Sequence, residues 1–212
     1  MGYLSRICTT IFILARKAER NFLADDMIPE IDKIEKDVVK YEERMDSVMQ
    51  TSRSLIRLCG KSITAMHSRD MKEAEEMLAQ VTEMGAKLSK LDTGLEQYSL
   101  QAYQEYAEAK VLYYIIKNGS IPSMKEVGVN ERAYLLGLMD VVGELKREAF
   151  ESLRKNDIGK AEKYYQLMVD IYDSTLHMRF AGMVLPDFRR KQDVARIQIE
   201  STVGELVRRG TK

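Results

Sequence analysis

Hydrophobic residues recur at spacings of three and four along most of the chain, and no stretch alternates polar and apolar residues as a strand would. This period is that of the α-helix, in which residues three or four apart share a face. The stripes and their capping residues predict helices that begin near Pro29, Asp70, Thr93, Glu131, Asp157 and Asp187. The stretch 119–130, rich in Gly, Pro and Ser, predicts a loop with space for a one-turn helix capped by Ser123 and Glu126. We therefore expect an all-α fold, a single-domain bundle of about six to seven long antiparallel helices.

The first 26 residues stand apart from this pattern. They hold an apolar run at residues 7–15, which is shorter than the about 20 residues that a bilayer-spanning helix needs. A secretory signal peptide is the alternative, but no small-residue cleavage site follows the run. Two aspartates and Pro29 then have the composition of a helix N-terminus. We expect residues 1–26 to be an N-terminal extension, residues 27–212 to be the helical domain, and no association with a membrane.

The predicted helix over residues 92–118 carries a glutamate within its apolar stripe. At about 100° per residue, Glu105 falls in line with Ala102, Ala109 and Leu112. Burying a bare carboxylate costs several kcal/mol, so such a group must be protonated, paired or bound to a cation. Glu108, one turn later, shares the edge of the same face. This helix therefore supplies one candidate pair of functional acids.

The predicted helix over residues 131–155 supplies a second pair. Asp140 and Glu144 are four residues apart, beside the apolar stripe of this helix. Gly137 and Gly143 flank Asp140, although glycine inside a helix costs about 1 kcal/mol relative to alanine. Close approach of a ligand explains the glycines, and so do contacts where two helices cross. Both interpretations stay open at this point.

The two pairs lie on helices that a single loop separates, so antiparallel packing would bring them together. The four acids are Glu105, Glu108, Asp140 and Glu144. Carboxylate oxygens are the ligands that Mg²⁺ or Mn²⁺ prefers, and such a cation can bind a phosphate oxygen and lower the pKa of a water molecule. The acids are therefore candidate metal ligands of a phosphodiesterase. A purely structural role, with the acids paired to residues such as Arg147, is the alternative.

The total charge does not indicate a polyanionic partner, because 33 Lys and Arg balance 33 Asp and Glu. Nucleic acid would need a local basic patch. Candidate phosphate contacts are Arg53, Arg57, Lys61, Arg189, Arg190 and Lys191. If these residues hold phosphates, affinity will fall as salt rises, whereas a charged face that only meets solvent binds nothing.

Histidine and cysteine provide no further site. His67 and His177 are far apart and outside any Cys/His ligand pattern, so we expect each at the surface or the edge of the core. Cys8 and Cys59 have no redox or metal spacing, and two lone thiols suit a reducing cytoplasm. Glycine-rich nucleotide loops and a Ser/His/Asp set are also absent from the sequence.

Two segments together resemble the translin/TRAX family, and its TRAX branch in particular. They are GLEQYSLQAYQEYAEA at 94–109 and YLLGLMDVVGEL at 134–145. The resemblance covers most of residues 30–210. It implies that Glu105 and Glu108 occupy the QEYxEA motif of TRAX, and that Asp140 and Glu144 occupy its YLLGxxDxxGEL motif.

The family supplies expectations about activity and assembly. TRAX-type subunits are metal-dependent endoribonucleases, whereas translin-type subunits bind nucleic acid without cutting it. Because this chain keeps all four acids, the resemblance implies a catalytic subunit with Glu105, Glu108 and Asp140 as catalytic residues and Mg²⁺ or Mn²⁺ as cofactor. It also implies a homo-oligomer, an octameric shell that encloses RNA, with single-stranded RNA as the expected substrate. A non-catalytic protein that binds single-stranded RNA or DNA is the alternative.

Overall fold

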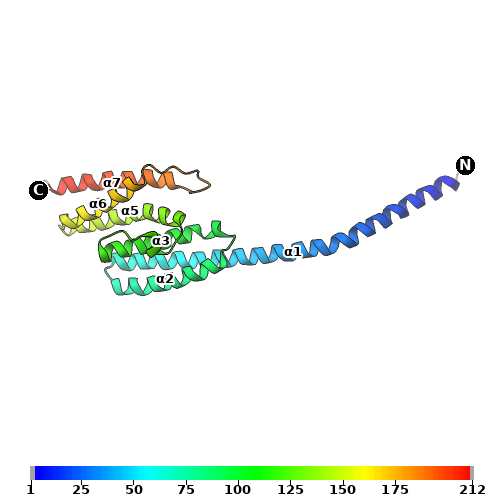
Figure 1. Ribbon diagram of the computed structural model, residues 1–212, viewed down its shortest axis with the longest axis horizontal. Coiled ribbons are helices and arrows are strands. Elements are labelled where there is room, and N and C mark those ends of the chain that lie inside the picture. Colours follow the sequence, from blue (N-terminus) through cyan, green and yellow to red (C-terminus); the bar gives the residue numbers. More distant parts are fainter. Residues whose placement is uncertain (1–2, 211–212) are drawn as a thin grey trace. The chain divides into compact units, whose positions relative to one another are not determined.

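The computed structural model describes the backbone of residues 3–210 and the side chains of residues 29–209. Within this range the chain forms seven helices and no strand (Figure 1). They are α1 (Tyr3–His67), α2 (Met71–Leu91), α3 (Glu96–Asn118), α4 (Met124–Val127), α5 (Glu131–Arg154), α6 (Ile158–Thr175) and α7 (Phe188–Gly210). The predicted all-α fold is confirmed, including the single turn of α4 with its capping box.

The chain divides into two compact units, residues 1–46 and 47–212. In the first unit, Pro29 lies inside α1, so the predicted helix start at this residue is wrong. Proline removes one N–H from a helix interior, yet α1 continues through this position. The side chains of the N-terminal extension lie outside the described residues, and the division at residue 26 stays a prediction. Among the described residues, no helix is both long and apolar enough to cross a bilayer.

Helix α5 lies at the centre of the second unit. It packs against α3, α6 and α7, while α2 packs against α3. The shared core includes Leu112 of α3, Leu145 of α5 and Met168 of α6, each with no exposed surface. The last turns of α1 join the same core through Leu55 and Met66. Two faces of α3 and most of α5 are therefore shielded from water.

In the second unit, two of the predicted caps, Asp70 and Asp157, are confirmed, and the predicted cap of α3 is wrong. Asp70 caps α2, because its side chain accepts a hydrogen bond from the backbone N–H of Glu73 at 2.9 Å. For α3 the predicted cap at Thr93 is wrong, since Leu95 is the N-cap residue and makes no side-chain cap. The Glu96 carboxylate reaches back instead and accepts from the N–H of Gly94 at 2.8 Å.

The two glycines around Asp140 have different surroundings. A Cβ at Gly137 would lie 2.6 Å from Cβ of Ala107 and 2.9 Å from the carbonyl oxygen of Gln104, so α3 and α5 cross closely at this point. A Cβ at Gly143 would meet only the side-chain amide of Gln198 in α7, at 3.1 Å. The interpretation as a crossing contact therefore holds at Gly137, whereas at Gly143 only a flexible side chain would have to move. The close approach at Gly137 also fixes the separation of the two acid-bearing helices.

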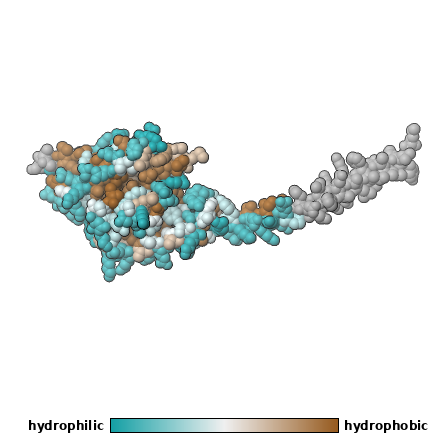
Figure 2. Space-filling view, in the orientation of Figure 1, coloured by the Kyte–Doolittle hydropathy of each residue, from teal (hydrophilic) through white to brown (hydrophobic). Residues whose placement is uncertain are grey.

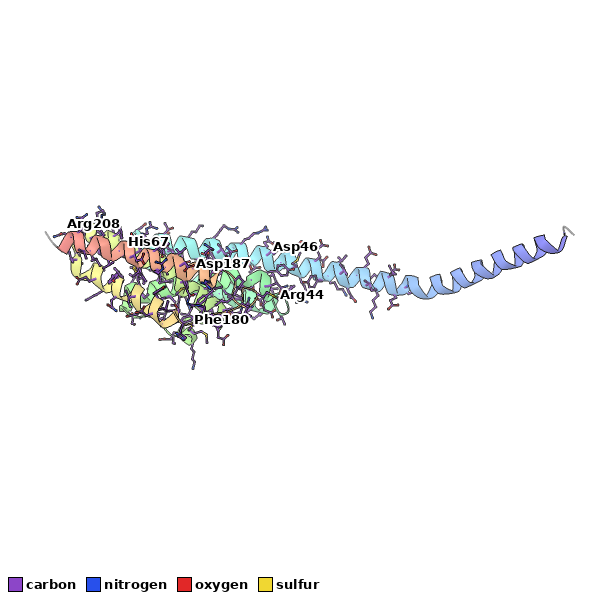
Figure 3. The ribbon with its side chains drawn as sticks, turned by 90° about the horizontal axis from the view of Figure 1, so that it is seen from above. Arg44, Asp46, His67, Phe180, Asp187 and Arg208 are labelled. Carbon is purple, nitrogen blue, oxygen red and sulfur yellow. The ribbon has the colours of Figure 1, made fainter. Side chains whose placement is uncertain are left out.

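Helix α6 ends at Thr175, earlier than the predicted 179–182, and a loop over residues 176–187 leads to α7. Phe180 lies in this loop (Figure 3). Its ring packs edge-on against Phe188, with ring centroids 5.7 Å apart. The Gln192 amide donates a hydrogen bond to the carbonyl oxygen of Thr175 at 2.7 Å. These contacts hold the first turn of α7, which carries Lys191, against the end of α6.

Candidate active site

A cavity of about 710 Å³ opens between α3, α5 and the start of α7. Three carboxylates that the sequence predicted as ligands line it: Glu105 and Glu108 from α3, and Asp140 from α5. We call these three residues the cavity acids. Gln104 and Lys191 line the same space. The close crossing at Gly137 explains how side chains more than 30 residues apart meet here.

The two glutamates of α3 are buried to different extents. Glu108 is only 9% exposed, whereas Glu105 is half-buried. The sequence predicted the reverse, with Glu105 inside the apolar stripe and Glu108 at its edge. The stripe of α3 is wider than predicted because neighbouring helices cover it on more than one side, and residues 106–109 are all buried.

Burial and mutual repulsion oppose ionisation of these glutamates. Loss of solvent, followed by repulsion from Asp140, Glu105 and Glu144, raises the pKa of Glu108 to about 9, although Lys191 acts against the shift. Burial, followed by repulsion from Asp140, also raises the pKa of Glu105. Among the described side chains, no hydrogen bond or ion pair reaches either glutamate.

The negative field extends to the neighbouring thiol. Cys59, fully buried in α1, has its pKa raised by burial and then by Glu105 and Glu108. The thiol forms no disulfide, and its raised pKa keeps it protonated.

Asp140, in contrast, has both carboxylate oxygens occupied. The Lys191 ammonium forms an ion pair with Oδ1, and the Gln104 amide donates a hydrogen bond to Oδ2 at 2.6 Å. The Lys191 and Asp140 side chains are 15% and 23% exposed, so this pair is largely shielded from water. The alternative partner named from the sequence, Arg147, is exposed and makes no ion pair among the described residues.

The cavity acids and Lys191 form a set with excess negative charge. If all three carboxylates ionise, the single ammonium leaves two negative charges uncompensated. Hard oxygen donors with this excess fit a divalent cation such as Mg²⁺ or Mn²⁺. As the side chains of residues 29–209 stand, no three His, Cys, Asp or Glu groups are gathered tightly enough to hold a metal ion. The Lys191 ammonium lies beside Oδ1 of Asp140, where it neutralises part of the negative charge.

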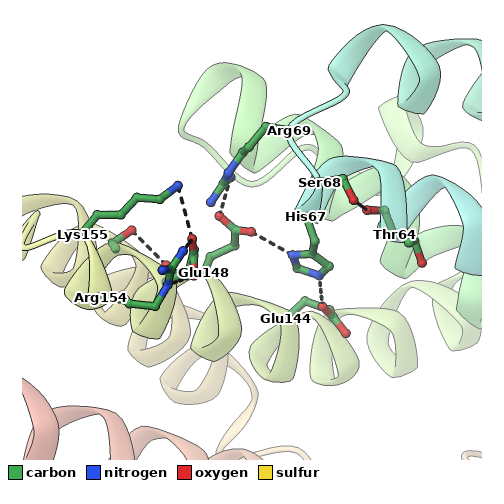
Figure 4. Close-up of polar contacts among 10 residues, drawn as sticks. Thr64, His67, Ser68, Arg69, Glu144, Glu148, Arg154 and Lys155 are labelled. Carbon is green, nitrogen blue, oxygen red and sulfur yellow. Dashed lines mark hydrogen bonds and ion pairs between the residues drawn. The ribbon is translucent and has the colours of Figure 1, made fainter.

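Glu144 belongs to a different group of residues. It does not line the cavity, and its carboxylate contacts Nε2 of His67 at the end of α1 (Figure 4). Nδ1 of His67 donates to Glu148 at 2.9 Å, and Arg69 donates to the other oxygen of Glu148 at 2.8 Å. We call His67, Arg69, Glu144 and Glu148 the His67 network.

The His67 network is charge-balanced. Carboxylates only accept, so contact with one at each ring nitrogen requires His67 to donate twice, as an imidazolium. Burial opposes its charge, but the hydrogen bonds to Glu144 and Glu148 outweigh burial and raise the pKa of His67. In the same way burial opposes the Glu148 charge, yet the bonds from His67 and Arg69 lower the pKa of Glu148.

Sequence reasoning missed this network. The expectation of a surface or core-edge position for His67 overlooked a side chain that is only 7% exposed. A signal was present, since Glu148 continues the four-residue spacing of Asp140 and Glu144 onto a buried face. A third inward acid requires a buried cation nearby. Arg69 also has a left-handed backbone, with φ of 67°, which costs about 1 kcal/mol or more in a non-glycine residue.

The predicted basic residues separate into two groups. Lys191 and Arg190 line the cavity, and Arg190 also meets Asp187 at 3.4 Å. Arg189 is exposed beside them. The remaining three, Arg53, Arg57 and Lys61, are exposed on α1 and are not part of the cavity lining.

Comparison with known proteins gives consistent matches over most of the chain. The translin family model matches residues 26–202. An uncharacterized protein of Methanocaldococcus jannaschii is 35% identical over 178 residues, which cover 80% of each chain. The crystal structure of AfC3PO is 27% identical, covering 86% of this chain and 97% of that one, with a TM-score of 0.80. The structure of AfC3PO with duplex RNA is 25% identical with a TM-score of 0.79 and the same coverage. The structure of apo-NeC3PO is 29% identical with a TM-score of 0.76, covering 85% and 97%.

Proposed function

Because this chain belongs to the translin family, we propose that it is a Mg²⁺- or Mn²⁺-dependent endoribonuclease of the TRAX-like branch. One observation carries the proposal. Three carboxylates from two helices converge on one cavity, and two of them lack any partner among the described side chains. A protein that needed these acids only for packing would pair them, as it pairs Glu148.

The proposed cation ligands are Glu105, Glu108 and Asp140, whereas Glu144, which the sequence grouped with them, lies one turn further along α5 and is held by His67. When bound, Mg²⁺ or Mn²⁺ supplies a Lewis acid for a phosphate oxygen and an acidified water for hydrolysis. Glu108 holds a proton at neutral pH, and loading of the site requires its release, so cation affinity rises with pH.

The cavity walls supply the groups that would bind an RNA strand. Arg190 and Lys191 are cations at its rim, and Gln97, Gln101 and Gln104 present amides along α3. A space of about 710 Å³ is large enough for a nucleotide-sized group. Support for RNA as the polyanion comes from the similar AfC3PO, whose structure was determined with duplex RNA.

We further propose a cytoplasmic homo-oligomer, an octamer by family resemblance. Hydrophobic residues gather on the visible face of the second unit, over α5 and α7 (Figure 2). Helix α7 also exposes large hydrophobic side chains, Ile197 and Val203 among them, which a partner copy would cover. Native mass spectrometry of the purified protein measures the number of copies directly.

The activity is tested with end-labelled RNA, both single-stranded and duplex, in Mn²⁺ or in EDTA. We expect Mn²⁺-dependent cleavage of single-stranded RNA that the double variant Glu105→Gln/Glu108→Gln abolishes, because both changes remove ligands while keeping side-chain shape. Glu162→Gln, an exposed acid of α6, is the matched control and should cut like the unmodified protein.

Other outcomes point to the alternatives. Equal cleavage by the double variant would refute the assignment of the acids. Salt-dependent binding that survives EDTA, without products under any divalent ion, would indicate a non-catalytic RNA- or single-stranded-DNA-binding protein. Absence of binding at low salt would indicate a structural scaffold.

A further inference from the structure

Lys191 is the cation beside the cavity acids, and it comes from a different helix. It lies in the first turn of α7, which Phe188 and Gln192 hold in place. Its ammonium pairs with Oδ1 of Asp140, and its charge acts against the rise in the pKa of both Glu105 and Glu108. One lysine thus faces three carboxylates.

Each oxygen of Asp140 already accepts from one donor. Gln104 donates to Oδ2 and Lys191 to Oδ1, so a cation that takes Asp140 as a ligand lies directly beside one of these donors. Gln104 is neutral, whereas the Lys191 ammonium repels an incoming cation. Lys191 is therefore the group that leaves. Its flexible four-carbon stem allows the ammonium to move while α7 stays fixed.

The released ammonium has a new partner in the same cavity. It remains at the wall that also carries Arg190, facing the space where a phosphodiester would lie. Phosphate oxygens accept charge-assisted hydrogen bonds from lysine, which would replace the lost pair with Asp140.

We infer that Lys191 is a removable counter-ion: it holds Asp140 until a divalent cation takes that carboxylate, and then contacts the phosphate of the substrate. The inference rests on the proposed function and adds one requirement, namely that Lys191 and the metal compete for the same oxygen. Competition for one oxygen is stronger than the effect of a positive charge that merely lies nearby.

Arg190 provides the control for that difference. It lines the same cavity and carries the same charge, but it pairs with Asp187 rather than with Asp140. Removing either cation favours metal binding through the general field, and only removal of Lys191 also frees an oxygen of Asp140. Comparison of Lys191→Met with Arg190→Met therefore separates competition for the Asp140 oxygen from the general effect of removing a positive charge.

The test is direct titration of Mn²⁺ into the RNA-free full-length protein, with electron paramagnetic resonance reporting free Mn²⁺. We expect Lys191→Met to lower the Kd for Mn²⁺ on the order of tenfold, and Arg190→Met to lower it by no more than about twofold. Lys191→Gln, which can still donate one hydrogen bond to Asp140, should fall between them and guards against misfolding of the first variant. Equal shifts for Lys191→Met and Arg190→Met, or no tightening in either Lys191 variant, would overturn the competition.

The second part of the inference is the contact between Lys191 and the phosphate of the substrate. At saturating Mn²⁺ we expect Lys191→Met to cleave RNA about tenfold more slowly than the unmodified protein, despite its tighter metal binding. Lys163→Met, an exposed lysine of α6, should cleave at the unmodified rate. Wild-type cleavage by Lys191→Met would overturn the phosphate contact.

If the unmodified protein cuts RNA and no Lys191 variant tightens Mn²⁺ binding, the counter-ion role fails and the proposed function stands. If the unmodified protein neither binds Mn²⁺ nor cuts RNA, both fail.

Discussion

The cavity acids and the His67 network share helix α5 but treat buried carboxylates in opposite ways. In the network, Glu148 is 1% exposed and is held by two donors, His67 and Arg69. In the cavity, Glu108 is 9% exposed and no described side chain donates to it. The network is neutral in sum, while the cavity set has more negative than positive groups.

This difference separates the acids that hold the fold from the acids that the proposed function assigns to a cation. A buried carboxylate that is fully hydrogen-bonded connects helices, here α1 to α5 across about 80 residues. A buried carboxylate that accepts no hydrogen bond destabilises the folded protein, and such groups are typical of ligand-binding sites. Removing charge from the two regions should therefore have opposite effects on stability.

The largest expected effect is in the His67 network. Glu148→Gln removes the charge that pairs with His67 and Arg69, and leaves a buried imidazolium with one partner fewer. Breaking a buried pair in this way should lower the free energy of unfolding by about 3–5 kcal/mol, measured by urea denaturation. Glu151→Gln is the control, because Glu151 pairs with Arg154 and Lys155 at the surface, where solvent screens the charges, and its loss should change stability far less. A loss below 1 kcal/mol in Glu148→Gln would contradict the structural role of the network.

A smaller loss is expected where α3 crosses α5. Gly137→Ala places a Cβ 2.6 Å from Ala107 and 2.9 Å from a backbone oxygen, so the helices must separate, at a cost of about 1–3 kcal/mol. Gly143→Ala meets only the flexible Gln198 side chain and gains helix propensity, so its stability should stay within about 1 kcal/mol of the unmodified protein. Thermal unfolding of the two variants side by side makes the comparison. Equal behaviour would mean that the crossing does not depend on Gly137.

The smallest expected change is a gain, in the cavity. Glu108 keeps its proton in the folded protein up to a pKa of about 9, but releases it near 4.5 when unfolded. The folded state thus binds more protons between these values, and its stability falls as pH rises through this window. Glu108→Gln removes the penalty and should stabilise the metal-free protein by about 1–2 kcal/mol at pH 8, with little gain at pH 5. Melting temperatures at the two pH values, in EDTA, test this. A variant less stable than the unmodified protein at pH 8 would show that Glu108 has a favourable partner.

The sequence by itself determined that the chain is helical and which acids share a face on α3 and on α5. Periods of three and four residues, with caps such as Asp70, predicted the all-α fold because these signals act within one or two turns of a helix. The same local period placed Glu105 and Glu108 together on α3, and Asp140 on the helix that follows the loop. The three acids line one cavity, as predicted. That they bind a metal ion stays a prediction.

Only the tertiary structure decided which partner each acid has. Asp140 meets Lys191 across 51 positions, and Glu144 meets His67 across 77 positions, distances over which a helical period carries no information. Those pairings depend on where the helices cross, as α3 and α5 do at Gly137. The crossing points in turn depend on packing of the whole core. The relative burial of Glu105 and Glu108 was decided in the same way, because helices from elsewhere in the chain cover the wider face of α3.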